Sequence, residues 1–178
     1  MEGAVFFMEN NLYRNLDAFE AYIGTPEKFE WYKKVFASYN VNGIEKFSWN
    51  WSWWSFFFAP THLIYRKCYI EALIIWLIQV FLIPTGFISL VFYIGTAVIS
   101  PLLIYRRYKR TLDKVEYSID DEATKIDTIR KLGGVDVVAR NIAIFLQFFV
   151  IFIFICNFLV MIGVHLFFFN FMTPFIFL

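Results

Sequence analysis

The chain has 178 residues, a formal net charge of +1 and a hydrophobic content of 60%. Soluble domains are roughly half apolar, so the excess favours contact with lipid over a larger protein core. A net charge this close to neutral gives no electrostatic basis for binding nucleic acid, and we expect no such partner.

Charge is unevenly distributed along the sequence. Residues 1–47 and 105–140 carry nearly all the charged side chains, and residues 141–178 contain no Lys, Arg, Asp or Glu. A helix needs about 20 mostly apolar residues to cross a bilayer, and soluble domains rarely contain an uncharged run longer than that. The pattern therefore predicts an all-α integral membrane protein with about three transmembrane helices.

Residues 1–47 are expected to form a small cytoplasmic helical unit. Thr25 before Pro26 is typical of a helix start, because a hydroxyl can cap the first turn and proline is tolerated there. The helix should end at residues 40–43, where Asn and Gly occur.

An aromatic stripe is predicted on that helix. Phe29, Tyr32 and Phe36 recur at i, i+3 and i+7, so they share one face. We expect the stripe to pack within the protein. The membrane surface, the segment after Tyr105 and a partner protein are alternatives.

Residues 48–65 are predicted to form an interfacial aromatic helix, broken at Ala59-Pro60 because proline disfavours helix at the residue before it. Tryptophan is enriched at the headgroup level of membranes. Most of the tryptophans fall in this segment, namely Trp49, Trp51, Trp53 and Trp54.

Residues 66–105 are predicted to form a transmembrane hairpin with spans at about 68–83 and 87–104. Basic residues flank the hairpin on both sides, whereas its turn at Pro84–Gly86 is uncharged. The positive-inside rule therefore places both outer ends and the N-terminus in the cytoplasm, and the turn outside.

Residues 106–140 are predicted to form a cytoplasmic amphipathic loop. Ser118 is the expected N-cap of its helix, and Gly133-Gly134 the expected end. Asp136 should cap a third span at about 137–160.

Residues 141–178 hold this third span and an apolar tail. The tail, from residue 165, contains Asn170 and Pro174 and is short for a crossing. We favour an interfacial or re-entrant tail, with a fourth span as the alternative.

An aromatic run ending in proline, Trp49 to Pro60, precedes a Leu-x-Tyr-Arg-Lys-x-Tyr pattern, Leu63 to Tyr69. This order resembles a bacterial membrane family of uncharacterised proteins, the domain-of-unknown-function family 2628. Further likeness extends the similarity to roughly residues 19–135: Phe19–Gly24, Tyr32-Lys33-Lys34 and Leu132-Gly133-Gly134. The resemblance implies a location in the inner membrane of bacteria. It supplies no known activity, so no functional residue is carried over.

Glu71 is the only acidic residue inside a predicted span. It follows Lys67 by four residues near the cytoplasmic edge, which favours an interfacial ion pair between them. The functional alternative is an intramembrane ion or proton site formed with Gln79. A hydroxyl of the second span would complete that site, that of Ser89, Thr96 or Ser100.

A basic cluster follows the second span, and a cluster of this kind can bind anionic lipid. Its members are Arg106, Arg107, Lys109, Arg110 and Lys114. The alternative is that these residues only fix the topology, by the positive-inside rule.

Neither a catalytic nor a cofactor or metal site is expected. His62 and His165 are isolated, and Cys68 and Cys156 lie in apolar segments, where thiols usually act as small hydrophobic groups. We therefore predict a non-enzymatic, multi-pass inner-membrane protein that packs with lipid and with other membrane proteins or itself. A subunit of a small oligomeric transporter or channel is the alternative.

Overall fold

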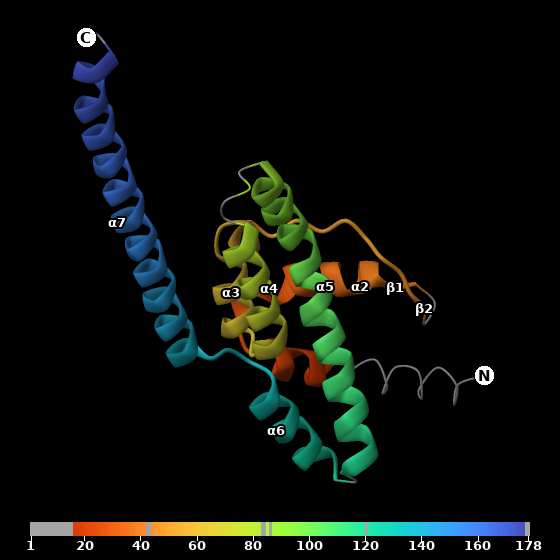
Figure 1. Ribbon diagram of the computed structural model, residues 1–178. Helices are drawn as coiled ribbons and strands as arrows, with labels where there is room; N and C mark the ends of the chain where they lie inside the picture. The colour runs from red at the N-terminus through yellow and green to blue at the C-terminus, as the bar shows by residue number, and fades with distance from the viewer. Residues whose placement is uncertain (1–15, 42–43, 83–84, 86, 120, 177–178) are drawn as a thin grey trace. The chain divides into compact units, whose positions relative to one another are not determined.

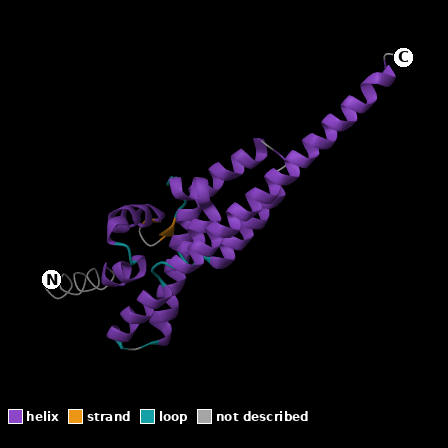
Figure 2. Ribbon diagram, turned by 90° about the vertical axis from the view of Figure 1, so that its left-hand side faces the viewer, coloured by secondary structure: helices purple, strands orange, loops and turns teal. Residues whose placement is uncertain are grey.

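The computed structural model describes residues 16–41, 44–82, 85, 87–119 and 121–176. The chain divides into two compact units, residues 1–140 and residues 141–178. Helices dominate both (Figure 2), which confirms the all-α class. The exception among the described residues is a short antiparallel pairing of β1 (Asn40–Val41) with β2 (Ile44–Glu45).

Unit 1 contains most of the helices (Figure 1). The first is a helix at residues 16–23. The others, in chain order, are the 3-10 helix η1 (Pro26–Lys28), α2 (Phe29–Tyr39), α3 (Trp53–Tyr65), α4 (Tyr69–Leu82), α5 (Phe87–Ser118) and α6 (Glu122–Leu132). The final helix, α7 (Val137–Ile176), starts in unit 1 and makes up unit 2.

The predicted helix start at Thr25 is present, but its hydroxyl does not cap the helix. Pro26 occupies the first turn of η1, and the Thr25 hydroxyl donates to the Ile23 carbonyl at 3.4 Å. It also accepts a hydrogen bond from Arg66 at 3.0 Å. Proline therefore starts the helix, while the threonine side chain holds a distant arginine.

The core of unit 1 is aromatic, and the predicted stripe lies in it. Phe36 packs edge-on against Tyr105 of α5, with ring centroids 5.3 Å apart, and Phe19 packs against Phe36 at 5.5 Å. Tyr32 is also buried, and Phe29 packs at the edge of the same core. The expectation that the stripe packs within the protein is confirmed.

Helix α3 is shorter than the predicted segment 48–65. Ser52 is its N-cap, and the Ser52 side chain accepts a hydrogen bond from the backbone of Ser55. The helix is kinked at Phe58, whose backbone is not helical. Pro60 explains the kink, because its ring clashes with the turn before it. Residues 46–52 are irregular instead of helical.

A turn with a left-handed residue joins α3 to α4. Lys67 has a φ of 59°, and the N–H groups of Lys67 and Cys68 donate to the carbonyls of Ile64 and Leu63. This is a Schellman motif, which usually contains glycine at the left-handed position. The turn reverses the chain so that α4 packs against α3.

Two stretches are long and apolar enough to cross a membrane, judged by length and composition. They are Phe87–Ser118 and Glu122–Phe152, whose most apolar 18 residues have mean hydropathies of 2.2 and 1.9. The predicted first span forms α4, which has 14 residues and is therefore about 21 Å long. The predicted turn at Pro84–Gly86 lies largely outside the described residues.

The predicted loop at 106–140 begins as helix. Helix α5 continues through the basic cluster to Ser118, so the expectation that Ser118 caps the next helix is wrong. Asp121 caps α6 instead, accepting from the Thr124 backbone at 2.9 Å. Asp136 caps α7 as predicted, accepting from the Ala139 backbone at 2.8 Å.

Gly133 and Gly134 end α6, as expected, and also join it to the start of the chain. The Gly134 N–H donates to the Tyr22 carbonyl at 2.6 Å. A Cβ on Gly133 would lie within 2.8 Å of Tyr22 backbone atoms. The close approach of the two segments therefore requires glycine at position 133.

Within its described residues, unit 2 is one uninterrupted helix. At 40 residues, α7 is about 60 Å long, twice the thickness of a hydrocarbon core. The helix runs through His165 and Pro174, so the residues of the predicted tail belong to the same helix as those of the predicted third span. A lone helix cannot bury its own side chains, and α7 therefore needs other apolar groups around it.

Candidate functional site

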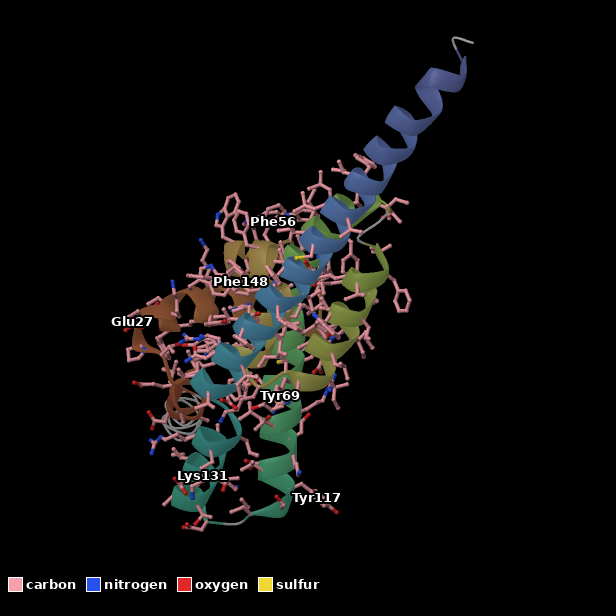
Figure 3. The ribbon with its side chains drawn as sticks, turned by 60° about the vertical axis from the view of Figure 1, so that its left-hand side comes forward. Glu27, Phe56, Tyr69, Tyr117, Lys131 and Phe148 are labelled. Atoms are coloured by element: carbon pink, nitrogen blue, oxygen red, sulfur yellow. The ribbon has the colours of Figure 1, made fainter. Side chains whose placement is uncertain are left out.

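An exposed aromatic surface precedes and begins α3. We define it as Trp49, Trp53, Trp54 and Phe57, whose side chains are between 57% and 67% exposed. Ser52 holds this aromatic surface beside Ala97 of α5, because the Ser52 N–H donates to the Ala97 carbonyl at 3.1 Å. Phe56, next to the aromatic surface, lies at the opposite end of unit 1 from Tyr117 and Lys131 (Figure 3).

Helices α4 and α5 extend the exposed apolar area. The side chains of α4 that remain exposed are almost all apolar: Ile70, Leu73, Ile74, Leu77, Ile78, Val80 and Phe81. The first turns of α5 expose Phe87, Ile88, Leu90, Val91 and Ile94. Monomeric soluble proteins rarely expose contiguous apolar patches of this extent, which usually mark contact with a protein or a membrane.

The structure does not bring Glu71 and Gln79 together. They are eight positions apart on α4, which is about 12 Å along the helix. Gln79 is buried, and its amide nitrogen is one of the described polar atoms without a hydrogen-bond partner. Glu71 pairs with Arg110 of α5 at 3.5 Å.

Two of the three hydroxyls predicted to complete that site bond to their own helix. Thr96 donates to the Tyr93 carbonyl and Ser100 to the Thr96 carbonyl, at 2.8 and 2.7 Å. The expected partner of Glu71 also differs, since Lys67 donates to the Lys131 carbonyl instead. The sequence could not reveal Arg110, because only the antiparallel packing of α4 and α5 brings it near Glu71.

The predicted basic cluster lies on the second half of α5. Arg106 pairs with Glu45 of β2 at 2.7 Å, and Arg110 pairs with Glu71. Lys109 and Lys114 are exposed, and Arg107 is half-buried. Acidic side chains of the same chain therefore hold part of the cluster, and its contact with anionic lipid stays a prediction.

A buried polar cluster lies beside the aromatic surface, and sequence reasoning missed it. The His62 Nδ1 lies 2.7 Å from the Ser55 hydroxyl, and its Nε2 lies 3.5 Å from the Tyr32 hydroxyl. Ser55 also donates to the Ser52 hydroxyl at 3.1 Å. The i, i+7 spacing of Ser55 and His62 would put both on one face of an unbroken helix, but Phe58 and Pro60 interrupt the helix between them, so the spacing was a weak signal.

A serine hydroxyl against an imidazole can act as an activated nucleophile, but two features argue against that here. Ser55 is completely buried, and its hydroxyl already contacts both Ser52 and His62. Burial, with Arg66 nearby, lowers the pKa of His62 to about 3, so the imidazole is a weak base. The geometry therefore fits a structural hydrogen-bond chain.

Arg66 joins this cluster to the first helix. Its guanidinium donates to the Ile23 carbonyl at 2.8 Å and lies over the Tyr32 ring, 4.4 Å from the centroid. Only 5% of Arg66 is exposed. A residue that the sequence placed at a membrane edge is thus a buried anchor between α3, α2 and the helix at residues 16–23.

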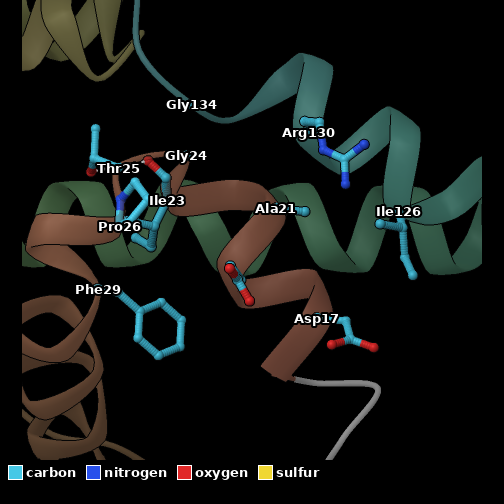
Figure 4. Close-up of a pocket in the computed structure, with 11 residues that line it drawn as sticks. Asp17, Ala21, Ile23, Gly24, Thr25, Pro26, Phe29, Ile126, Arg130 and Gly134 are labelled. Atoms are coloured by element: carbon cyan, nitrogen blue, oxygen red, sulfur yellow. Dashed lines mark hydrogen bonds between the residues drawn. The ribbon is translucent and has the colours of Figure 1, made fainter.

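A shallow cleft of about 720 Å³ opens between the first helix, η1 and α6 (Figure 4). Asp17 and Ala21 reach it from the first helix, and Ile126 and Arg130 from α6. Its lining mixes acidic, basic and apolar groups, and it holds no nucleophile next to a base.

Within the described residues, no group of His, Cys, Asp and Glu could hold a metal ion. Cys68 is buried and Cys156 is exposed, and both are free thiols. No catalytic or cofactor role follows from either.

No curated protein and no solved structure matches the chain. A family described as "Protein of unknown function (DUF2628)" matches residues 4–106. The match begins before the likeness noted in the sequence and ends earlier, so it leaves out α6 and the two glycines. It covers more than half of the sequence, and the chain therefore belongs to the DUF2628 family of proteins of unknown function.

Proposed function

We propose that the protein is a non-enzymatic, multi-pass component of the bacterial inner membrane, with its N-terminus in the cytoplasm. In this proposal α4, the first half of α5 and α7 contact acyl chains, and the aromatic surface lies at the headgroup level. The apolar helices pack with lipid and with other membrane proteins or further copies of this chain.

The exposed face of α4 carries this proposal. From Ile70 to Phe81 its exposed side chains are apolar, while its buried face packs against α3 and α5. Burying about 25 cal/mol per Å² of apolar surface is favourable, so leaving this face in water is costly. Lipid or a membrane partner removes that cost.

The separation of charged and apolar regions in unit 1 also supports the membrane location. The charged second half of α5, with α6, lies away from the exposed apolar turns at Phe87 and Ile88. Tryptophan favours the boundary between hydrocarbon and water, and the aromatic surface lies between these two regions.

Fractionation of cells that express the full chain tests the membrane location. After lysis without detergent, the protein should sediment with membranes, remain there through alkaline carbonate washing, and dissolve only in detergent. Recovery in the high-speed supernatant would overturn the proposal.

Cross-linking in intact membranes, followed by mass spectrometry, tests the partner claim separately. We expect a defined adduct with another membrane protein or a second copy. A membrane protein that gives no protein adduct would leave lipid as its only contact and contradict that claim.

The second candidate, a subunit of an oligomeric transporter or channel, is supported by Gln79. Its buried amide nitrogen has no partner among the described residues, and such a group in a membrane helix often marks a polar pathway. Glu71 is half-buried on the same helix, about 12 Å along it from Gln79.

Ion flux into liposomes that contain the purified protein tests this candidate. A transport role predicts flux that Gln79→Leu or Glu71→Gln reduces. Lys28→Gln, at an exposed position on η1, is the matched control and should leave it unchanged. Absence of flux above that of empty liposomes would contradict the transport role.

A further inference from the structure

We propose that Arg107, beside the start of α4, binds a phosphate group. Phospholipid headgroups and free phosphate both supply this group. The binding site lies within unit 1 and goes beyond the membrane location proposed above, because its residues can hold a phosphate from either source.

Arg107 is the half-buried member of the basic cluster, and the chain leaves its charge unmatched. Its neighbours on α5 are paired, Arg106 with Glu45 and Arg110 with Glu71. The Arg107 Nε is buried without a hydrogen-bond partner, and no ion pair joins Arg107 to a carboxylate among the described residues. A buried donor without an acceptor is unfavourable, and more so when it is charged. Arg107 therefore lacks an acceptor that the rest of unit 1 does not supply.

Three segments of unit 1 meet around Arg107. Its charge lies within electrostatic reach of Tyr22 on the first helix, and of Cys68 and Tyr69 at the start of α4. Only 3% of Tyr22 is exposed, and its hydroxyl is also without a partner in the described part of the chain. Burial raises the pKa of this hydroxyl, and the nearby charges of Arg107 and Arg66 oppose the rise. Two neighbouring groups that can donate hydrogen bonds thus lack an acceptor.

The first turn of α4 adds to the positive potential around Arg107. The first N–H groups of a helix have no partner within the helix and carry a partial positive charge. The Cys68 thiol, just before them, donates to the Arg66 carbonyl at 3.7 Å, so it does not accept from these groups. Glu71 in the same turn opposes the potential, but Arg110 already pairs with it. The surroundings therefore favour an anion.

A phosphate group suits these donors. Arginine binds phosphate through two parallel N–H groups, and such charge-assisted hydrogen bonds are about twice as strong as neutral ones. Arg107 is half-buried, so a ligand can reach its guanidinium from outside. The remaining phosphate oxygens can accept from N–H groups at a helix start. A phospholipid bound here would place its chains beside Ile70, which is 73% exposed, whereas a soluble phosphate would leave Ile70 uncovered.

Ligand binding by the full chain, purified in a non-ionic detergent, tests the proposal. Inorganic phosphate is the first probe and phosphatidylglycerol in mixed micelles is the second. Diacylglycerol is the control lipid, because it has the same chains without the phosphate. Native mass spectrometry counts the bound molecules, and the unfolding midpoint should rise with a probe that binds only the folded chain.

Arg107→Gln should weaken the binding of phosphatidylglycerol, or of inorganic phosphate, by at least about tenfold, because it removes a charge-assisted hydrogen bond. Lys109→Gln removes the same charge at an exposed position two residues further along α5, and this matched control should leave binding unchanged. Arg107→Lys keeps the charge without the two parallel N–H groups, so its affinity should lie between those of the wild type and Arg107→Gln. Without a probe, Arg107→Gln should unfold at no lower temperature than the wild type.

Binding of phosphatidylglycerol alone would support a lipid headgroup as the source, and binding of both probes would show that the phosphate group suffices. Binding of neither probe, or equal binding of diacylglycerol and phosphatidylglycerol, would overturn the proposal. Equal losses in Arg107→Gln and Lys109→Gln would overturn it as well. An Arg107→Gln protein that fails to fold, or melts far below the wild type without a probe, would show that the chain itself holds this arginine, which also contradicts the proposal.

Discussion

The two halves of α5 belong to one continuous helix but differ in chemistry and surroundings. From Phe87 to Gly95 every side chain is exposed or half-buried, and none is charged. From Thr96 onwards the helix has a buried face, which packs against α2, α3 and α6. The first half needs a partner outside the folded unit, whereas the second half supplies the centre of the protein's own core.

This contrast shows that apolar sequence alone does not identify a lipid-facing helix. Ile104 and Ile88 are chemically identical, yet Ile104 is fully buried and Ile88 is 57% exposed. The difference lies in the neighbours that the fold provides.

Truncating these two isoleucines to alanine should give the largest difference in stability between the two halves of α5. Ile104→Ala leaves a cavity in the core and should lower the free energy of unfolding by about 2–5 kcal/mol. Ile88→Ala should change it by no more than about 0.5 kcal/mol. Thermal unfolding in detergent micelles compares them, and equal losses would contradict the assignment of the core to the second half.

Alanine substitution should change the stability of the protein in opposite directions at two glycines. Gly133→Ala forces a Cβ into the Tyr22 backbone and should cost about 1–3 kcal/mol. Gly95→Ala, on α5, meets nothing within 4 Å and should stabilise the helix by up to about 1 kcal/mol. A neutral Gly133→Ala in the same unfolding assay would show that α6 does not dock against the first helix.

His62 should make stability depend on pH. Its pKa is about 3 in the folded protein because of burial, against an ordinary value near 6.5. Between these values the unfolded chain binds the additional proton, so stability should fall as the pH decreases from about 6.5. The slope is at most about 1.4 kcal/mol per pH unit.

Replacing the imidazole isolates this effect from that of the carboxylates. His62→Asn keeps a polar group near Ser55 but cannot take up a proton. Unfolding midpoints measured between pH 5 and 7 should depend on pH less in His62→Asn than in the wild type. The same slope in both proteins would show that His62 is protonated in the folded state.

The smallest expected effect concerns the ion pair between the halves of the hairpin. Arg110 is mostly exposed, so Arg110→Gln should cost less than about 1 kcal/mol. A loss of several kcal/mol in the unfolding assay would mean that the pair lies in a dry environment, and would contradict the exposure of Arg110 to water.

Local sequence signals predicted several features correctly. The aromatic stripe, the helix end at Gly133 and the cap at Asp136 each depend on residues close together in sequence. The change in charge at Arg106 predicts a boundary there, but α5 continues through it to Ser118. No proline or glycine interrupts the sequence between Pro101 and Ser118, so the backbone had no reason to stop there.

The remaining features depend on tertiary contacts. The pairing of Glu71 with Arg110 and the burial of Arg66 against Tyr32 join residues far apart in the sequence. The sequence does not predict the left-handed conformation of Lys67, because glycine usually occupies that position of the turn.

Spin-label accessibility along α5 tests the central claim most directly. Ile88→Cys and Tyr117→Cys are labelled separately in lipid bilayers, in the background that carries Cys68→Ala and Cys156→Ala. Molecular oxygen concentrates in lipid, whereas a nickel chelate stays in water. We predict that oxygen relaxes the label at position 88 strongly and the chelate only weakly, with the reverse at position 117. Strong relaxation of both labels by the chelate would contradict the account.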